Sequence, residues 1–317
     1  MAVCKFPVRS DFYGLGIRIG FYFLWFGTIL AAWIAPSEIR SLRLFIDLFV
    51  AATFLALIVT TINDVNNLQP VETYIVLLLA FGAYLALIPI YILRLLTCCD
   101  PYWNPSRWPL VSQSPLQANL SFIMLLGLLV YQYWFIFDRI PDLDRVNCDE
   151  YGFFFGQLKL NSRTFIVLNA LFFFFLGLVA LYILILKVRF MLGFPDPNET
   201  GPKRQISRRH KAAHIALLRN LDIWAKFIVA IAVTVAVEAT ISWNEIKGVS
   251  SLASVGQAIP FVIGLVAVLR ILYVYFYVRD DDYDSDSEYS YRTWHGQQRH
   301  DRAPPPDLPP MGSGAPH

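Results

Sequence analysis

The sequence has little charge. Only 16% of its 317 residues are Asp, Glu, Lys or Arg, whereas 56% are hydrophobic and 15% are aromatic. A soluble globular domain carries about 25% charged and roughly 45–50% apolar residues. The formal net charge is only +2, so the chain also lacks the strong positive balance of nucleic-acid-binding proteins, and we expect no nucleic-acid partner. This composition excludes an ordinary soluble domain and indicates a protein whose main partner is the lipid bilayer.

The sequence also lacks the motifs of common catalytic sites. It contains no Gly-x-Ser-x-Gly, His-Glu-x-x-His or P-loop pattern, and its last hydrophobic run has no lysine for a retinal Schiff base. The four cysteines do not have metal-site spacing, and His210 and His214 stand among basic residues without a carboxylate nearby in the sequence. We therefore predict a protein that is not an enzyme and that has no cofactor and no bound metal.

What the chain does contain is a series of hydrophobic runs. A helix needs about 20 mostly apolar residues to cross a bilayer, and seven runs reach that length, separated by turn-forming clusters of Pro, Asn, Asp and Ser. The predicted spans are Phe12–Ile34, Leu42–Ile62, Glu72–Leu93, Asn119–Phe137, Thr164–Lys187, Asp222–Trp243 and Ser254–Val278. Pro89 should kink the third span, because proline removes a helix hydrogen bond. The fold class predicted is an all-α, polytopic transmembrane helix bundle of about seven spans.

The basic residues in the loops predict the orientation of the bundle. One side, which includes the short N-terminal segment 1–11, carries seven Lys and Arg residues in its loops. The loops of the other side carry twelve, and the C-terminal tail adds four more. Because basic loops stay in the cytoplasm, we predict an outer N-terminus and a cytoplasmic C-terminus. The pattern fits a plasma membrane and an endomembrane equally.

Five polar residues inside the predicted spans are candidate site residues: Arg18, Asp47, Glu238, Gln257 and Arg270. Charges within a bilayer are costly, and they are usually paired or functional. Arg18 and Glu238 lie about 8 to 9 Å from the outer ends of their spans at 1.5 Å per residue, and this matched depth predicts an ion pair. Arg270 and Asp47, nearer the inner face, are the second expected pair. Either these groups fix the packing of the helices or they mark a ligand or ion pathway.

Small residues indicate where helices approach closely. Gly16 and Gly20 stand four residues apart in the first span, and Gly256, Pro260 and Gly264 form a similar line in the last span. Such lines let helix backbones come close together in membranes. We therefore predict helix contacts at both places.

The cysteines are candidate modification sites. Cys4 and Cys148 fall on the predicted outer side, where an oxidising compartment would permit a disulfide between them. Cys98 and Cys99 follow the third span directly, which is a typical position for palmitoylation.

The loop 188–221 and the tail 279–317 carry much of the charge. In residues 203–219 basic side chains surround an apolar stripe, which predicts an amphipathic helix that attracts anionic lipid by roughly 1 kcal/mol per basic residue. Plain anchoring by positive charge is the alternative. Ser207 in this segment is a candidate for a basic-directed kinase, and Ser285 and Ser287 for an acidic-directed one. The acidic and Pro-rich tail should be disordered, and we expect it to bind a cytoplasmic protein.

Two blocks of the chain carry a resemblance to a known family. The first span contains the pattern Tyr13, Gly14, Gly16, Arg18 and Gly20. The later block contains Trp243, Asn244, Gly248, Gly256, Gln257, Pro260 and Gly264. Together they resemble a family of uncharacterised multi-pass membrane proteins of filamentous fungi, although Leu24 stands where that family usually has Gln before Trp25. The resemblance implies the multi-span architecture and no established activity.

The sequence favours a non-enzymatic, sensor-like or receptor-like seven-span protein, in which the bundle couples to the basic loop and the tail. The alternative is a small transporter or channel with a polar path through Arg18, Asp47, Glu238 and Arg270. A sensor predicts that changes at Ser207 or in the tail alter partner binding without any flux. A transporter predicts flux that is lost in Glu238→Gln or Arg270→Gln.

Overall fold

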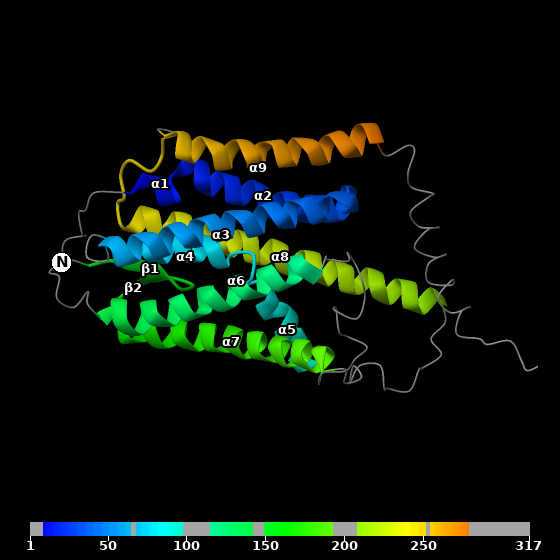
Figure 1. Cartoon of the computed structure of the whole chain (residues 1–317), viewed down its shortest axis with the longest axis horizontal. Coiled ribbons are helices and arrows are strands. Elements are labelled where there is room, and N and C mark those ends of the chain that lie inside the picture. Colours follow the sequence, from blue (N-terminus) through cyan, green and yellow to red (C-terminus); the bar gives the residue numbers. More distant parts are fainter. Residues whose placement is uncertain are drawn as a thin grey trace, which may run out of the picture. The chain divides into compact units, whose positions relative to one another are not determined.

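The structure is a computed structural model that describes residues 9–64, 68–97, 115–141, 149–192, 208–251 and 254–278 (Figure 1). The helices are α1 (Ser10–Tyr13), α2 (Leu15–Ile34), α3 (Ile39–Asp64), α4 (Pro70–Phe81), α5 (Leu87–Leu96), α6 (Pro115–Trp134), α7 (Arg163–Met191), α8 (Arg208–Trp243) and α9 (Val255–Tyr273). A 3-10 turn, η1 (Pro36–Glu38), joins α2 to α3, and π-helical turns continue α6 as η5 (Phe135–Arg139) and α9 as η7 (Val274–Val278). The strands β1 (Tyr151–Phe153) and β2 (Gln157–Lys159) form a small antiparallel hairpin. The predicted helical bundle is confirmed.

The bundle comprises the residues up to Ile271, and the residues from Leu272 onward form a second unit. Of this second unit the structure describes the helical segment to Val278, in which the rings of Tyr273 and Tyr277 stack.

Within the described residues, six helical segments are long and apolar enough to cross a membrane. They are Ser10–Ile34, Pro36–Asn63, Gln117–Arg139, Arg163–Arg189, Ala216–Trp243 and Val255–Tyr277. Each corresponds to one of the predicted spans, so the chain is an integral membrane protein. At 1.5 Å per residue, the 36 residues of α8 extend about 54 Å, well beyond a hydrocarbon core of about 30 Å. The helix that spans the membrane therefore continues into the basic segment that begins at Arg208.

The third predicted span is divided into two helices. The short apolar helix α4 ends at Phe81, a turn covers residues 82–86, and α5 begins at Leu87. The first turn of α4 contacts α1, where the Tyr13 hydroxyl donates to Glu72. We call this the hairpin end of the bundle, because β1 also packs against α4 there. The turn and α5 lie toward the opposite end, called the η1 end after the turn that joins α2 to α3.

The local chemistry explains why this helix is interrupted. Pro89 has no N–H to donate to the Leu85 carbonyl, and its ring would crowd that carbonyl in a continuous helix. The Leu85 carbonyl instead accepts from the Ile88 N–H at 3.1 Å, and the Phe81 carbonyl accepts from Tyr84 at 2.7 Å. These tighter turns satisfy backbone groups that could not be left open in lipid. Pro89 was predicted to kink the third span, and the structure shows a break in the helix before Pro89.

Glycine permits close packing at the two places where α2 meets its neighbours. A Cβ on Gly20 would lie 2.5 Å from the Pro260 carbonyl oxygen, and one on Gly264 would lie 2.9 Å from the Gly20 carbonyl oxygen. The lines of small residues in the first and last spans therefore face each other at Gly20, Pro260 and Gly264. On the other side of α2, the ring of Trp25 occupies the space beside Gly82 at the start of the helix break.

Candidate functional site

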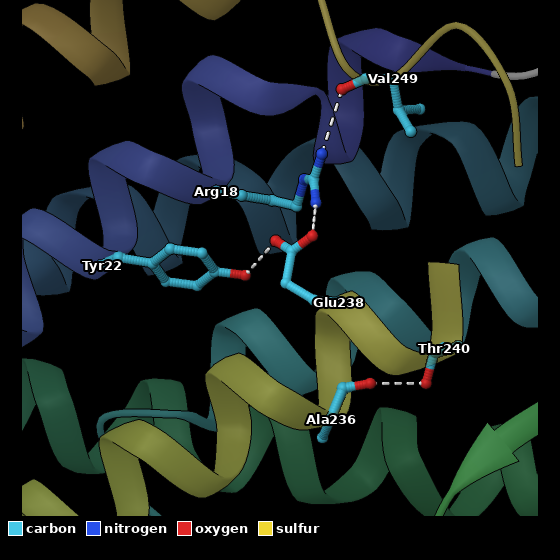
Figure 2. A network of polar contacts seen from close by, with 6 residues as sticks. All are labelled: Arg18, Tyr22, Ala236, Glu238, Thr240 and Val249. Atoms are coloured by element: carbon cyan, nitrogen blue, oxygen red, sulfur yellow. Dashed lines mark hydrogen bonds and ion pairs between the residues drawn. The ribbon is translucent and has the colours of Figure 1, made fainter. Parts of the chain in front are cut away.

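An ion pair near the hairpin end joins α2 to α8 (Figure 2). Arg18 Nη1 donates to Glu238 Oε2, as the matched depth predicts, and Arg18 Nη2 donates to the Val249 carbonyl at 3.1 Å. The other carboxylate oxygen, Glu238 Oε1, accepts from the Tyr22 hydroxyl at 2.9 Å. The Arg18 side chain is only 3% exposed, whereas that of Glu238 is 47% exposed. Arg18 therefore ties three segments together: α2, α8 and the loop that leads to α9.

The β-hairpin is held by Asn244, the residue that follows α8. The Asn244 side chain donates from Nδ2 to the Tyr151 carbonyl at 2.7 Å and accepts the Tyr151 N–H on Oδ1 at 2.8 Å. These two hydrogen bonds are the same pair that a neighbouring β-strand would make with the backbone of Tyr151. Trp243 stacks on Phe153 with ring centroids 5.9 Å apart. The Trp243–Asn244 pair, part of the second family-like block, thus fastens a hairpin that the hydrophobic pattern did not predict.

Two buried carboxylates lie beneath this hairpin. Glu72 Oε1 accepts from the Arg9 N–H at 3.0 Å and the Tyr13 hydroxyl at 2.8 Å, and Glu150 Oε2 accepts from the Val71 N–H at 2.8 Å. Burial raises the pKa of Glu150 to about 7; the Val71 N–H opposes this rise and the negative charge of Glu72 adds to it. Their bonds connect the N-terminal turn, α4 and the hairpin, which identifies them as structural links.

The second predicted ion pair is wrong. Arg270 Nε bonds to Glu38 Oε2 at 2.8 Å rather than to Asp47. Glu38 belongs to the short turn η1, and the sequence analysis did not place it in a span. Asp47 Oδ2 instead accepts from the Ser121 hydroxyl of α6 at 2.7 Å. Arg18 with Glu238, Arg270 with Glu38, and Asp47 with Ser121 are thus separate groups.

Asp47 belongs to a cavity between the helices in the half of the bundle toward the η1 end. The cavity has a volume of about 440 Å³, within the range of small-molecule sites. It lies beside the break between α4 and α5, and most of its wall is apolar, from residues such as Ile46, Leu87 and Leu125. Its polar lining comes from Arg43, Asp47, Ser121, Lys187, Asp222 and Lys226, together with Trp25 and Tyr84. A smaller hollow of about 60 Å³ shares Arg43, Asp222 and Lys226 with it and reaches Pro36 and Arg219.

The charges of the cavity are unequally matched. Lys226 Nζ bonds to Asp222 Oδ2 at 2.5 Å, one helical turn away on α8. Arg43 interacts electrostatically with both Asp222 and Asp47. Lys187 has neutral contacts: its Nζ donates to Asn119 Oδ1 at 2.6 Å and to the Ala118 carbonyl at 3.3 Å, and it lies 5.0 Å from the centroid of the Phe122 ring. With every group ionised, three basic and two acidic side chains line the cavity.

Two donors in the wall of the cavity lack a partner. Trp25 is 5% exposed and Tyr84 is 8% exposed. Neither the Trp25 Nε1 atom nor the Tyr84 hydroxyl makes a hydrogen bond to any part of the chain that the structure describes. A buried polar group without a partner costs about 1 to 3 kcal/mol, so natural structures usually satisfy such groups. This cavity is therefore the candidate ligand site.

Gln257 lies away from the cavity. It is fully buried on α9, its side chain would meet a Cβ on Gly14, and its amide has no hydrogen-bond partner among the described residues. The close approach of α2 and α9 thus extends from Gly20 to Gly14. The remaining predicted site residues lie outside the described residues: Cys4, Cys98, Cys99, Cys148, Ser207, Ser285 and Ser287. Among the residues that are described, no group of three His, Cys, Asp or Glu side chains is placed to hold a metal ion.

Sequence reasoning missed several residues that carry the polar contacts. Glu38 and Glu150 lie in segments read as loops, and Tyr84 and Trp25 are hydrophobic in the pattern. Glu72 could have been identified from the sequence, because it is the first residue of a predicted span and has no charged neighbour there. The cavity residues Asp222 and Lys226 could also have been identified, since they stand one helical turn apart inside a predicted span.

The fold and this cavity define the class: an integral membrane protein with a largely apolar cavity, lined in part by charged residues, between its helices. Comparison with protein-family models, with curated proteins and with solved structures gives no match. Any more specific function is therefore argued from the site itself.

Proposed function

We propose that the protein is a non-enzymatic, receptor-like or sensor-like membrane protein that binds a small molecule in the cavity between α2, α3, α5, α6, α7 and α8. The observation that carries this proposal is the cavity of about 440 Å³ beside an interrupted helix, with two buried donors unpartnered. Irregular backbone at membrane depth occurs where protein buries it or where it lines a polar cavity.

The packing above the cavity supports a binding site over a continuous pathway. Phe21, Leu24 and Phe81 are fully buried between the cavity and the hairpin end. The Trp25 ring fills the space beside Gly82. The polar path expected through Arg18, Asp47, Glu238 and Arg270 is not continuous, because these residues belong to three separate groups.

Helix α8 offers a route by which binding could be sensed. Asp222 and Lys226 line the cavity, and the same unbroken helix begins at Arg208 in the basic segment. A ligand that changes the Asp222–Lys226 pair would therefore act on a helix that reaches the membrane surface. The basic segment 203–219, with Ser207 and anionic lipid, and the tail 279–317, with a protein partner, are the proposed outputs.

A transporter is the second candidate, and one observation favours it. Transporters commonly build their binding sites from discontinuous transmembrane helices, and α4 and α5 form such a helix. In this case the Trp25 and Gly82 contact would be a gate that opens toward the hairpin end.

The test is a ligand screen on the full chain in nanodiscs, scored by the shift in melting temperature. A true ligand should stabilise the wild type and lose its effect in Ala83→Phe, which fills the cavity. The matched control is Ala258→Phe, on an exposed position of α9. Ligands that stabilise both variants equally would overturn the cavity as the site. Uptake of a confirmed ligand into proteoliposomes would replace the receptor with the transporter.

A further inference from the structure

We propose that the ligand of this cavity is a small organic anion with an apolar body, such as a medium-chain carboxylate. This inference rests on the proposed function and names the chemical class that the site would take. It follows from three features of the cavity: the kind of groups left unpartnered, the position of Lys187, and the charge of the smaller hollow beside it.

The unpartnered groups in the wall are hydrogen-bond donors. Trp25 Nε1 can only donate, and the Tyr84 hydroxyl has a proton to offer. The acceptors of the same wall are already engaged, since Asp47 accepts from Ser121 and Asp222 accepts from Lys226. Trp25 Nε1 and the Tyr84 hydroxyl are themselves buried, so a ligand acceptor pairs with them only after a local shift of the wall.

Lys187 supplies the positive charge that the cavity does not balance. Its described contacts are two neutral oxygen atoms and an aromatic ring. Both carboxylates of the wall interact electrostatically with Arg43, and one of them, Asp222, also forms an ion pair with Lys226. An anionic group in the cavity would pair with Lys187. A cationic group would instead add a fourth positive charge to the three basic side chains of the wall.

The smaller hollow beside the cavity also favours a negatively charged ligand. The smaller hollow at the η1 end contains Arg43, Lys226 and Arg219, with Asp222 as its acidic residue. The hollow shares Arg43, Asp222 and Lys226 with the cavity, and basic groups that line a hollow raise the local concentration of anions. The apolar wall then requires that the rest of the ligand be hydrophobic. The volume of about 440 Å³ corresponds to about 15 water molecules at roughly 30 Å³ each, which suits a compact single-chain ligand.

The experiment measures equilibrium binding of radiolabelled octanoate to the full chain in phosphatidylcholine nanodiscs. Octanoate should bind saturably, and unlabelled octanol and octylamine should compete poorly. Lys187→Met should weaken binding about tenfold or more, because hydrogen bonds to a charged group are the stronger kind. Lys247→Met, at an exposed position of the loop after α8, is the matched control and should bind like the wild type.

The anion can reach the cavity from two sources, and a second arm separates them. If a lipid headgroup is the natural occupant, phosphatidic acid added to the nanodisc should displace octanoate from the wild type. If the occupant is a soluble acid, phosphatidic acid should leave octanoate binding unchanged. Either result supports the anionic class.

Two outcomes would overturn the inference. Octylamine or octanol binding as tightly as octanoate, and sensitive to Ala83→Phe, would keep the ligand site and remove the preference for an anion. Octanoate binding that Lys187→Met and Ala83→Phe leave unchanged would place the molecule in the bilayer instead. The proposed function fails separately, if the broader screen finds no compound whose effect depends on the cavity.

Discussion

The hairpin end and the η1 end of this bundle use polar residues in opposite ways. At the hairpin end Arg18, Glu72 and Glu150 are buried and join segments far apart in the chain. At the η1 end the helices line a cavity, and Lys187 in its wall contacts, among the described residues, two neutral oxygen atoms and an aromatic ring. The polar residues of the hairpin end hold segments of the chain together, whereas those of the η1 end line the proposed ligand site.

This difference shows that polar residues within a membrane span are not all functional. From the sequence alone, Arg18, Asp47, Glu238 and Arg270 were all candidate functional residues. The structure separates the residues that link segments from the residue that lines the cavity. The comparison predicts that substitutions at the hairpin end cost stability and that substitutions around the cavity change ligand binding.

The largest loss of stability is expected from Glu238→Gln. This change leaves the guanidinium of Arg18, 3% exposed, without its counter-ion, and unpaired buried charges cost about 3 to 5 kcal/mol. Arg18→Gln should cost less, because the Glu238 side chain is 47% exposed. Unfolding free energies in detergent, measured by titration with dodecyl sulfate, would give both values. The double mutant should lose less than the two single mutants together, and strictly additive losses would show that the two residues do not act as a pair.

Gly20→Ala is expected to cost about 3 kcal/mol, the upper part of the usual range for overpacking. The new methyl would meet the backbone carbonyl of Pro260 at 2.5 Å, and a helix backbone cannot turn aside as a side chain can. Gly156→Ala in the hairpin is the matched control, because a Cβ there has no atom within 4 Å. The same unfolding assay applies. Equal losses in the two variants would mean that α2 and α9 do not pack closely at Gly20.

Stability should also depend on pH through Glu150. Burial raises the pKa of this carboxyl from 4.5 to about 7, so the folded protein holds a proton that the unfolded chain releases. The stabilisation is complete below about pH 4.5 and is lost as the pH rises toward 7, by on the order of 3 kcal/mol for a shift of this size. Glu150→Gln should remove this slope, since the amide is neutral throughout. Melting temperatures of both proteins from pH 4.5 to 8 would test this, and an unchanged slope in the variant would assign it to another group.

Much of the fold was predictable because a membrane span leaves a strong signal in the sequence. Each of the six long apolar helices falls on a predicted run, and the depths of Arg18 and Glu238 were enough to predict their pairing. Depth along a helix follows directly from residue count. The close helix contacts at Gly20 and Gly264 were also predictable from spacing, since small residues four apart share one face, whereas the pairing of these two faces was not predicted.

The rest required information that the hydrophobic pattern does not contain. Arg270 was assigned to Asp47 by depth alone, but Glu38 lies in η1, whose turn carries its carboxylate to Arg270. The Trp25 ring lies beside Gly82, where the interruption at 82–86 begins, and this is a tertiary contact. The cavity needs side chains from six helices, and no single stretch of sequence indicates it.

The smallest effect is expected from Arg270→Gln, which removes the ion pair between Arg270 of α9 and Glu38 of η1. The Arg270 side chain is 59% exposed, and its length lets the guanidinium reach the polar interface whether or not it meets Glu38. Exposed ion pairs contribute about 0.2 to 1 kcal/mol, so the loss should stay below about 1 kcal/mol in the assay used for Glu238→Gln. Octanoate binding should not change, because Arg270 does not line the cavity. A loss as large as that of Glu238→Gln would show that the η1 end is also held by a structural charge, and the contrast between the two ends would then be confined to the cavity wall.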